Sequence, residues 1–233
     1  TYVTGNASRY AAITLRNAIT AFVAEKFDIA PDQVQFEDGF VHANGSSVSY
    51  SDLAKEMKSA GQTPRALYAY EAPKTQSLGT GGDMHFAYSF AAQAAQVEVN
   101  QITGEVKVLN VIAANDVGMA VNPLGLQGQV EGGVMMGLGH CLTEEFIVKD
   151  GHVVTDYLAR YRMPGIMLTP EIKAIIVEHP TAEGPYGAKG VGEICSIPTT
   201  PAITNAIHNA VGVRLDRTPV DQELIARELW EIE

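Results

Sequence analysis

The clearest fold signal in the chain is the stretch Gln96-Val97-Glu98-Val99-Asn100-Gln101-Ile102-Thr103-Gly104-Glu105-Val106-Lys107-Val108. Polar and apolar residues alternate on both sides of Thr103-Gly104, which is typical of two strands joined by a turn. The pattern predicts two extended segments, residues 86–100 and 105–114, that pair as a hairpin.

Upstream of this hairpin, the sequence predicts a small α+β subdomain over residues 1–60. An apolar stripe near the 3.6-residue period predicts a helix over 7–27. The turn Glu37-Asp38-Gly39 between two alternating runs predicts a small hairpin, which a short helix follows. We expect Ser51 or Asp52 to be the N-cap of that helix, because both side chains can accept a hydrogen bond from a free backbone amide.

Residues 61–85 contain prolines and glycines with little periodicity, which predicts a long connector. Residues 86–233 are expected to form the C-terminal subdomain. After the first hairpin, its predicted elements are a glycine-rich helix over 125–144, a hairpin over 146–154, a buried strand over 172–178, a helix capped by Thr199 or Thr200 and ended by Gly212, and a terminal helix over about 220–231. Helices and hairpins mix without a regular strand–helix–strand rhythm, which favours the α+β class with hairpin-rich mixed sheets.

Composition narrows the possible partners and the compartment. The 233 residues carry a formal net charge of −11, which repels phosphate backbones, so nucleic acid is not an expected partner. No apolar run reaches the roughly 20 residues that a membrane helix needs. The chain contains only two cysteines, and this low number is typical of a protein in the reducing cytoplasm. The six histidines show no zinc-ligand spacing, so no metal site made of side chains is expected. Because the chain opens on Thr1 and not on methionine, we expect a piece of a longer protein.

One carboxylate, Glu193, ends the glycine-rich turn Gly187-Ala188-Lys189-Gly190-Val191-Gly192-Glu193. A glutamate can act as a general base, and glycines let a backbone turn tightly and bring the carboxylate close to a partner. The simpler interpretation is a surface glutamate in a loop, since glutamates are mostly exposed. For Lys189, a solvated lysine is the favoured interpretation.

A second glycine-rich stretch, Leu126-Gln127-Gly128-Gln129-Val130-Glu131-Gly132-Gly133, lies at the start of the predicted helix over 125–144. Glycines inside a helix cost roughly 1 kcal/mol each relative to alanine, so they indicate that something approaches the backbone closely. That partner is a cofactor or another helix, and the sequence leaves both open. The amide of Gln129 can donate and accept, so it can bind an oxo group or the edge of a pterin.

Taken in order, the motifs of this chain resemble the molybdenum-binding subunit of the xanthine dehydrogenase and aldehyde oxidoreductase family, the molybdenum hydroxylases, in its C-terminal portion. The resemblance covers nearly the whole chain. It is carried by Thr1 to Asn17, the hairpin of Gln96 to Val106, the loop from Ala114 to Pro123, Gly128-Gln129-Val130-Glu131-Gly132, Tyr161-Arg162-Met163-Pro164, and Ala188 to Glu193.

The resemblance implies a molybdopterin-dependent oxidoreductase. Such an enzyme hydroxylates an electron-poor carbon of an N-heterocycle, or as second choice of an aldehyde, with oxygen derived from water. It implies Glu193 as the catalytic base and Gln129, Gly128 and Gly192 as cofactor-binding residues, with no side chain ligating the metal. The cofactor would be a molybdenum–pyranopterin, either molybdopterin or its cytosine dinucleotide. Iron–sulfur clusters and FAD would lie on partner domains or subunits, and the upstream half of the molybdenum subunit would complete the site.

Two other interpretations stay open. The chain can be a packing module or a degenerate relative without catalysis, and Cys195 and Ser196 stand where many family members have two prolines. It can also be a pterin- or nucleotide-binding protein without redox chemistry.

Overall fold

The computed structural model describes residues 1–232 and divides the chain into two compact units, Thr1–Gly82 and Asp83–Glu233. The first unit contains α1 (Tyr2–Phe27), the short 3₁₀ helix η1 (Pro31–Gln33), the antiparallel strands β1 (Gln35–Glu37), β2 (Phe40–Ala43) and β3 (Ser46–Ser49), and α2 (Tyr50–Ser59). The predicted helix and hairpin are therefore present, and β3 is a third strand that the sequence did not indicate. Val23, Val41 and Leu53, each 1% exposed, form the centre of this unit's core.

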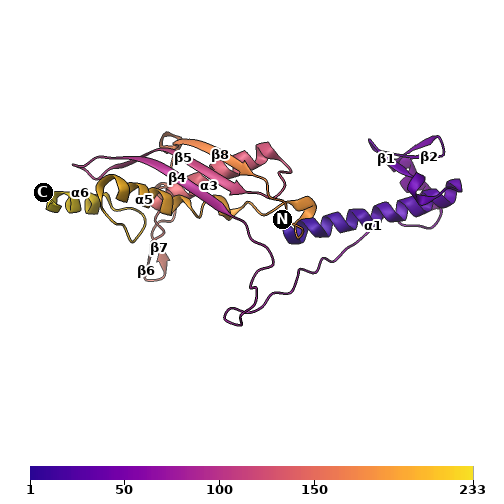
Figure 1. The fold of residues 1–233 in the computed structure, drawn as a ribbon, viewed down its shortest axis with the longest axis horizontal. Helices are drawn as coiled ribbons and strands as arrows, with labels where there is room; N and C mark the ends of the chain where they lie inside the picture. Colours follow the sequence, from indigo (N-terminus) through magenta and orange to yellow (C-terminus); the bar gives the residue numbers. More distant parts are fainter. Residues whose placement is uncertain (233) are drawn as a thin grey trace. The chain divides into compact units, whose positions relative to one another are not determined.

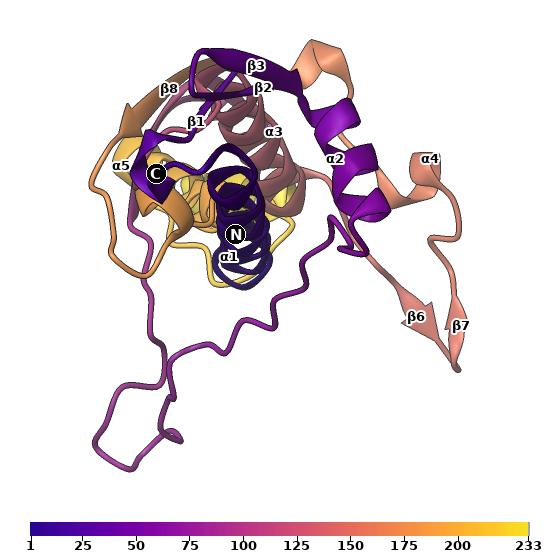
Figure 2. The ribbon, with the colours of Figure 1, turned by 90° about the vertical axis from the view of Figure 1, so that its right-hand side faces the viewer.

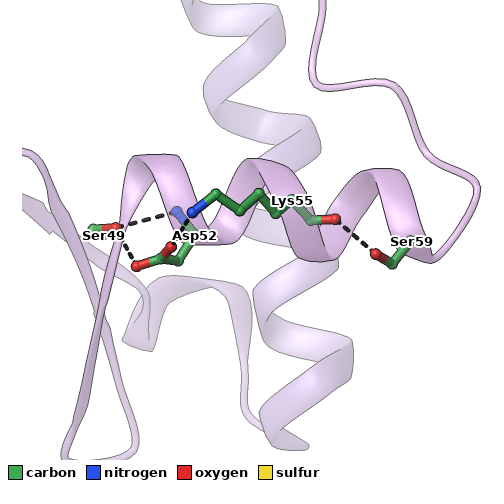
Figure 3. A network of polar contacts seen from close by, with 4 residues as sticks. All are labelled: Ser49, Asp52, Lys55 and Ser59. Atoms are coloured by element: carbon green, nitrogen blue, oxygen red, sulfur yellow. Dashed lines mark hydrogen bonds and ion pairs between the residues drawn. The ribbon is translucent and has the colours of Figure 1, made fainter.

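The prediction of Ser51 or Asp52 as the N-cap of α2 is wrong, because the helix begins earlier. Ser49 has an extended backbone, and its hydroxyl accepts a hydrogen bond from the Asp52 amide at 3.1 Å. The Asp52 carboxylate accepts from the Ser49 hydroxyl at 2.8 Å and from the Lys55 ammonium at 2.7 Å (Figure 3). Several neighbouring side chains can cap a helix, and the backbone conformation of Ser49 decides which one does.

A mixed three-stranded sheet organises the second unit. Its strands are β4 (Ala91–Val99), β5 (Val106–Asp116) and β8 (Glu171–Val177), in the order β4-β5-β8. The pair β4–β5 is antiparallel, which confirms the predicted hairpin, and β8 joins β5 in parallel. The predicted strand over 172–178 exists as β8, but its predicted burial is wrong. As an edge strand it buries alternate side chains only partly and leaves Ile175 38% exposed.

Helices cover one face of this sheet (Figure 1). They are α3 (Pro123–Leu142), which is the predicted glycine-rich helix, and α5 (Thr199–Val211), with α6 (Gln222–Ile232) at the C-terminal end. The core between the layers includes Val111, Val130, Val134, Ile203 and Ile207, each 0% exposed. Because α3 and α5 also contact each other, the N-terminal half of α3 is held beside the segment that precedes α5.

Shorter elements complete the second unit. The hairpin of β6 (Val148–Lys149) and β7 (His152–Val153) was predicted, and it stands away from the sheet (Figure 2). The others are α4 (Leu158–Tyr161) and the 3₁₀ helices η2 (Ile166–Leu168), η3 (Pro185–Gly187) and η4 (Glu193–Cys195). Within residues 1–232, no helix combines the length and apolar character that a membrane crossing requires.

The predicted cap of α5 is also wrong. Pro198 is the N-cap residue, and Thr199 is the first residue of the helix, with no side-chain cap. The Thr199 hydroxyl donates to Gln93 Oε1 on β4 at 2.7 Å, so it ties α5 to the sheet. Gly212 ends the helix in the left-handed conformation, as predicted.

Candidate cofactor site

Four of the six glycines of α3 lie on two faces with different environments. A Cβ atom built at Gly133 would collide with Cys195, and one at Gly137 would collide with Thr199 and the Ser196 carbonyl. These glycines let α3 pack closely against η4 and the first turn of α5. For this face, the helix-packing interpretation of the glycine-rich sequence holds.

The other glycine face of α3 is open. Gly128 and Gly132 are exposed, and a Cβ atom built at either would meet nothing within 4 Å. Glycine in a helix costs roughly 1 kcal/mol relative to alanine, yet no contact among the described residues requires it here. Packing within residues 1–232 therefore does not account for these two glycines.

A hydrogen bond joins this open face to the second glycine-rich motif. Gln129 Nε2 donates to the carbonyl of Gly192 at 3.3 Å. A Cβ atom at Gly192 would likewise meet nothing within 4 Å, so the bare backbone of this residue borders the same open region. Gly128, Gln129 and Gly192 are thus brought together from parts of the sequence more than sixty residues apart.

Glu193 directly follows Gly192 as the first residue of η4, and its side chain is exposed. Its carbonyl accepts hydrogen bonds from the amides of Ser196 at 2.9 Å and Ile197 at 3.2 Å. Among the described residues, its carboxylate has no hydrogen-bond or ion-pair partner. The position of this carboxylate therefore depends on how the backbone around Glu193 is held.

Lys189 is buried, so the favoured interpretation of a solvated lysine is wrong. Its Nζ lies 2.6 Å from Asp116 Oδ2, and the two side chains are 6% and 12% exposed. The Gly118 amide donates to the other carboxylate oxygen at 3.0 Å. Burial by itself raises the pKa of Asp116, but the hydrogen bonds from Lys189 and Gly118 outweigh it and hold the pKa below its usual value.

No local sequence pattern indicates this ion pair, because the two residues lie 73 positions apart. The pairing of β5 with β8 and the loop contacts that follow bring them together. The remaining carboxylate of the motif, Glu131, accepts from Gln127 Nε2 at 2.8 Å one helical turn away. In residues 1–232, no group of three or more His, Cys, Asp or Glu side chains is arranged to hold a metal ion.

Comparison with known proteins places the chain in a class. The profile of the molybdopterin cofactor-binding domain matches residues 1–170. The chain belongs to this family, whose cofactor is a molybdenum-bound pterin, and the resemblance drawn from the motifs is confirmed. The α+β class is confirmed as well.

Three similar proteins show which enzymes carry this domain. A probable xanthine dehydrogenase subunit of Bacillus subtilis is 40% identical over 76% of this chain and 23% of its own length. The probable hypoxanthine oxidase of Escherichia coli is 33% identical over 100% of this chain and 24% of its own length. The solved aldehyde oxidoreductase of Desulfovibrio gigas superposes with a TM-score of 0.69 at 30% identity, over 80% of this chain and 20% of that one. The chain thus spans about a quarter of the length of the curated relatives that it matches.

Proposed function

We propose that the chain is the C-terminal part of a molybdenum hydroxylase subunit. The proposed reaction is hydroxylation of an electron-poor carbon of an N-heterocycle with oxygen derived from water, and aldehydes are the second substrate class. The observation that carries the proposal is the hydrogen bond from Gln129 to Gly192, because it joins both glycine-rich motifs into one open surface beside Glu193.

The residues at this surface fit a pterin cofactor. Gly128, Gly132 and Gly192 present bare backbone where a side chain would face open space, so a flat ring system can approach closely. The Gln129 amide has one further N–H and a carbonyl oxygen with which it can hydrogen-bond to the polar edge of such a ring. When bound there, the molybdenum–pyranopterin supplies the redox centre that accepts electrons from the substrate.

In this proposal Glu193 is the catalytic base. Its carboxylate is exposed at the open surface, and no internal partner among the described residues competes for it. It is therefore available to take up a proton when substrate is hydroxylated. A general base of this kind contributes roughly 10²–10⁴-fold to a rate.

The proposed substrate class rests on the names of the relatives, and the proposed partners rest in part on exposed apolar side chains. Two of the relatives are named for xanthine and hypoxanthine, which are N-heterocycles, and one is named for aldehydes. We propose that the upstream half of the molybdenum subunit completes the site, and that iron–sulfur and FAD domains or subunits carry electrons onward. The consecutive apolar residues Ile166, Met167 and Leu168 are 87%, 92% and 51% exposed, which supports a covering partner, since contiguous exposed apolar patches mark interfaces.

Metal content together with isotope labelling tests this function. The chain, assembled with its upstream half and partner subunits, is purified and analysed for molybdenum, then offered hypoxanthine or an aldehyde in ¹⁸O-labelled water with an artificial electron acceptor. Bound molybdenum and labelled product are the expected results. A folded assembly without molybdenum would favour a packing module, and a pterin without hydroxylation would favour a binding protein.

Replacing Gln129 by alanine tests the role of that amide. Loss of one hydrogen bond of about 1–1.5 kcal/mol predicts a roughly tenfold fall in pterin retention or in turnover. Gln127→Ala is the matched control, because Gln127 lies on the same helix and bonds only to Glu131 among the described residues. Equal molybdenum content and equal rates in both variants would remove Gln129 from the site.

A further inference from the structure

The turn that carries Glu193 has little support of its own. Between η3, which ends at Gly187, and η4, which begins at Glu193, the turn contains Gly190 and Gly192 and belongs to no helix or strand. Glycine loses more conformational freedom on ordering than any other residue, so such a turn keeps one conformation only where other parts of the molecule hold it.

The structure places a buried ion pair at the upstream end of this turn. Lys189, four residues before Glu193, reaches Asp116 at the end of β5 with a nitrogen-to-oxygen distance of 2.6 Å. The Lys189 amide also donates to the Val117 carbonyl at 2.9 Å, and the Met119 amide donates to the Gly187 carbonyl at 3.0 Å. The side chain and the backbone of the turn are therefore fixed to the same strand end.

Two further contacts hold the turn on either side of Glu193. Gln129 on α3 binds the carbonyl of Gly192, and Gln93 on β4 donates to the carbonyl of Cys195 at 2.7 Å. All of these contacts act on the backbone or on Lys189, and none acts on the Glu193 carboxylate. The position of that carboxylate therefore follows the position of the backbone that carries it.

From this arrangement we infer that the Asp116–Lys189 ion pair positions Glu193, and the inference rests on the proposed role of Glu193 as base. A buried ion pair is a poor device for stability alone, since apolar residues of similar size often serve as well or better. It does impose geometry, because the ammonium and the carboxylate must meet at hydrogen-bonding distance and direction. Lys189 and Asp116 are therefore positioning residues that act through the backbone of the turn.

A double variant separates positioning from stability. Lys189→Met leaves Asp116 buried without its partner, whereas Asp116→Leu with Lys189→Met replaces the pair by apolar side chains and restores stability. We expect kcat of the assembled protein to fall about 10²-fold in both, with KM within about threefold of wild type, because misplacement near 1 Å costs this much. Molybdenum content stays unchanged, and amide hydrogen exchange in residues 187–195 becomes about tenfold faster in both.

Controls distinguish the possible failures. Lys55→Met breaks the exposed pair with Asp52 and should change neither rate nor exchange. A double variant with recovered stability, wild-type kcat and unchanged exchange would overturn the positioning role, provided that Glu193→Gln measured beside it is inactive. Should Glu193→Gln retain the full rate, the role of Glu193 as base falls, and the positioning role falls with it.

Discussion

Charge burial decides what Asp116 and Lys189 contribute to stability. Exposed ion pairs, such as the one between Arg160 and Asp156, typically contribute at most about 1 kcal/mol. Asp116 and Lys189 are 12% and 6% exposed, and removing one partner of such a buried pair costs about 3–5 kcal/mol. A single substitution here should therefore be among the most destabilising polar changes in the second unit.

The stability that Asp116 contributes should depend on pH, and Asp116→Asn tests this dependence. Because the folded-state pKa of Asp116 is lowered below its usual value, the ionised form stabilises the fold above the unfolded pKa of about 3.9. This stability is lost as pH falls through the folded pKa. Urea midpoints of wild type should thus exceed those of Asp116→Asn at pH 7, and the gap should narrow below about pH 4. A gap that stays constant from pH 7 to pH 3 would contradict the pairing.

The two thiols should be unreactive in the folded protein. Burial raises the pKa of Cys141 to about 12 and also raises the pKa of Cys195, and the thiolate is the reactive form. Mass spectrometry after iodoacetamide treatment at pH 8 should show no modification in the fold and two modified cysteines in urea. Rapid labelling of Cys195 without denaturant would mean that η4 separates from α3.

At the residue scale, the sequence indicated candidate site residues but not the contacts that those residues make. Glu193 and Gln129 were recognised from ordered motifs, and their proposed roles remain predictions. Lys189 was misjudged, because its charge looks like that of any surface lysine until β5 supplies a carboxylate. The cap at Ser49 was missed because several adjacent residues have side chains that can cap a helix. The cap at Pro198 was missed because no side chain caps that helix.

Among the elements, α3 carries the most information, because its two glycine faces have different causes. Gly133 and Gly137 permit close contact with η4 and α5, whereas Gly128 and Gly132 border open space. The sequence predicted this glycine-rich helix correctly. It could not assign the glycines to faces, because that assignment depends on where η4 lies.

Alanine substitutions distinguish the two faces. Gly128→Ala should raise the free energy of unfolding by up to about 1 kcal/mol, because alanine favours the helix and the space is open. Gly133→Ala should lower it by about 1–3 kcal/mol, because the new Cβ atom collides with Cys195. Urea midpoints measure both. In the assembled protein, Gly128→Ala should hold less molybdenum despite its greater stability, and equal effects of the two substitutions on stability would contradict the two-face description.

In the sheet, the sequence pattern predicted the local hairpin but not which strand lies at the edge. Alternation and the Thr103-Gly104 turn were sufficient for the β4–β5 hairpin, since both strands are local to the turn. The apolar run of β8 was predicted to be buried, yet β8 is an edge strand that pairs in parallel with β5. Which strand lies at an edge depends on the whole sheet, and a single apolar run does not contain that information.

At the scale of the molecule, each unit has its own core, and the residues of this chain that are proposed for the site all lie in the second unit. The division of the sequence into 1–60, 61–85 and 86–233 stays a prediction. Since the chain spans about a quarter of its curated relatives, the open surface by Glu193 is proposed to be one wall of a larger site. Such a surface would contain glycines that contact nothing within this chain, because their contacts would be made by the cofactor and the rest of the site.

The turnover of Glu193→Gln at full molybdenum loading tests the central claim most directly. Glutamine keeps the size and polarity of the side chain but cannot take up the proton, so the rate in the assembled protein should fall roughly 10²–10⁴-fold. Molybdenum content should equal that of wild type, and Glu131→Gln, the matched control on α3, should keep the wild-type rate. A Glu193→Gln protein that binds molybdenum and hydroxylates substrate within twofold of wild type would contradict the account.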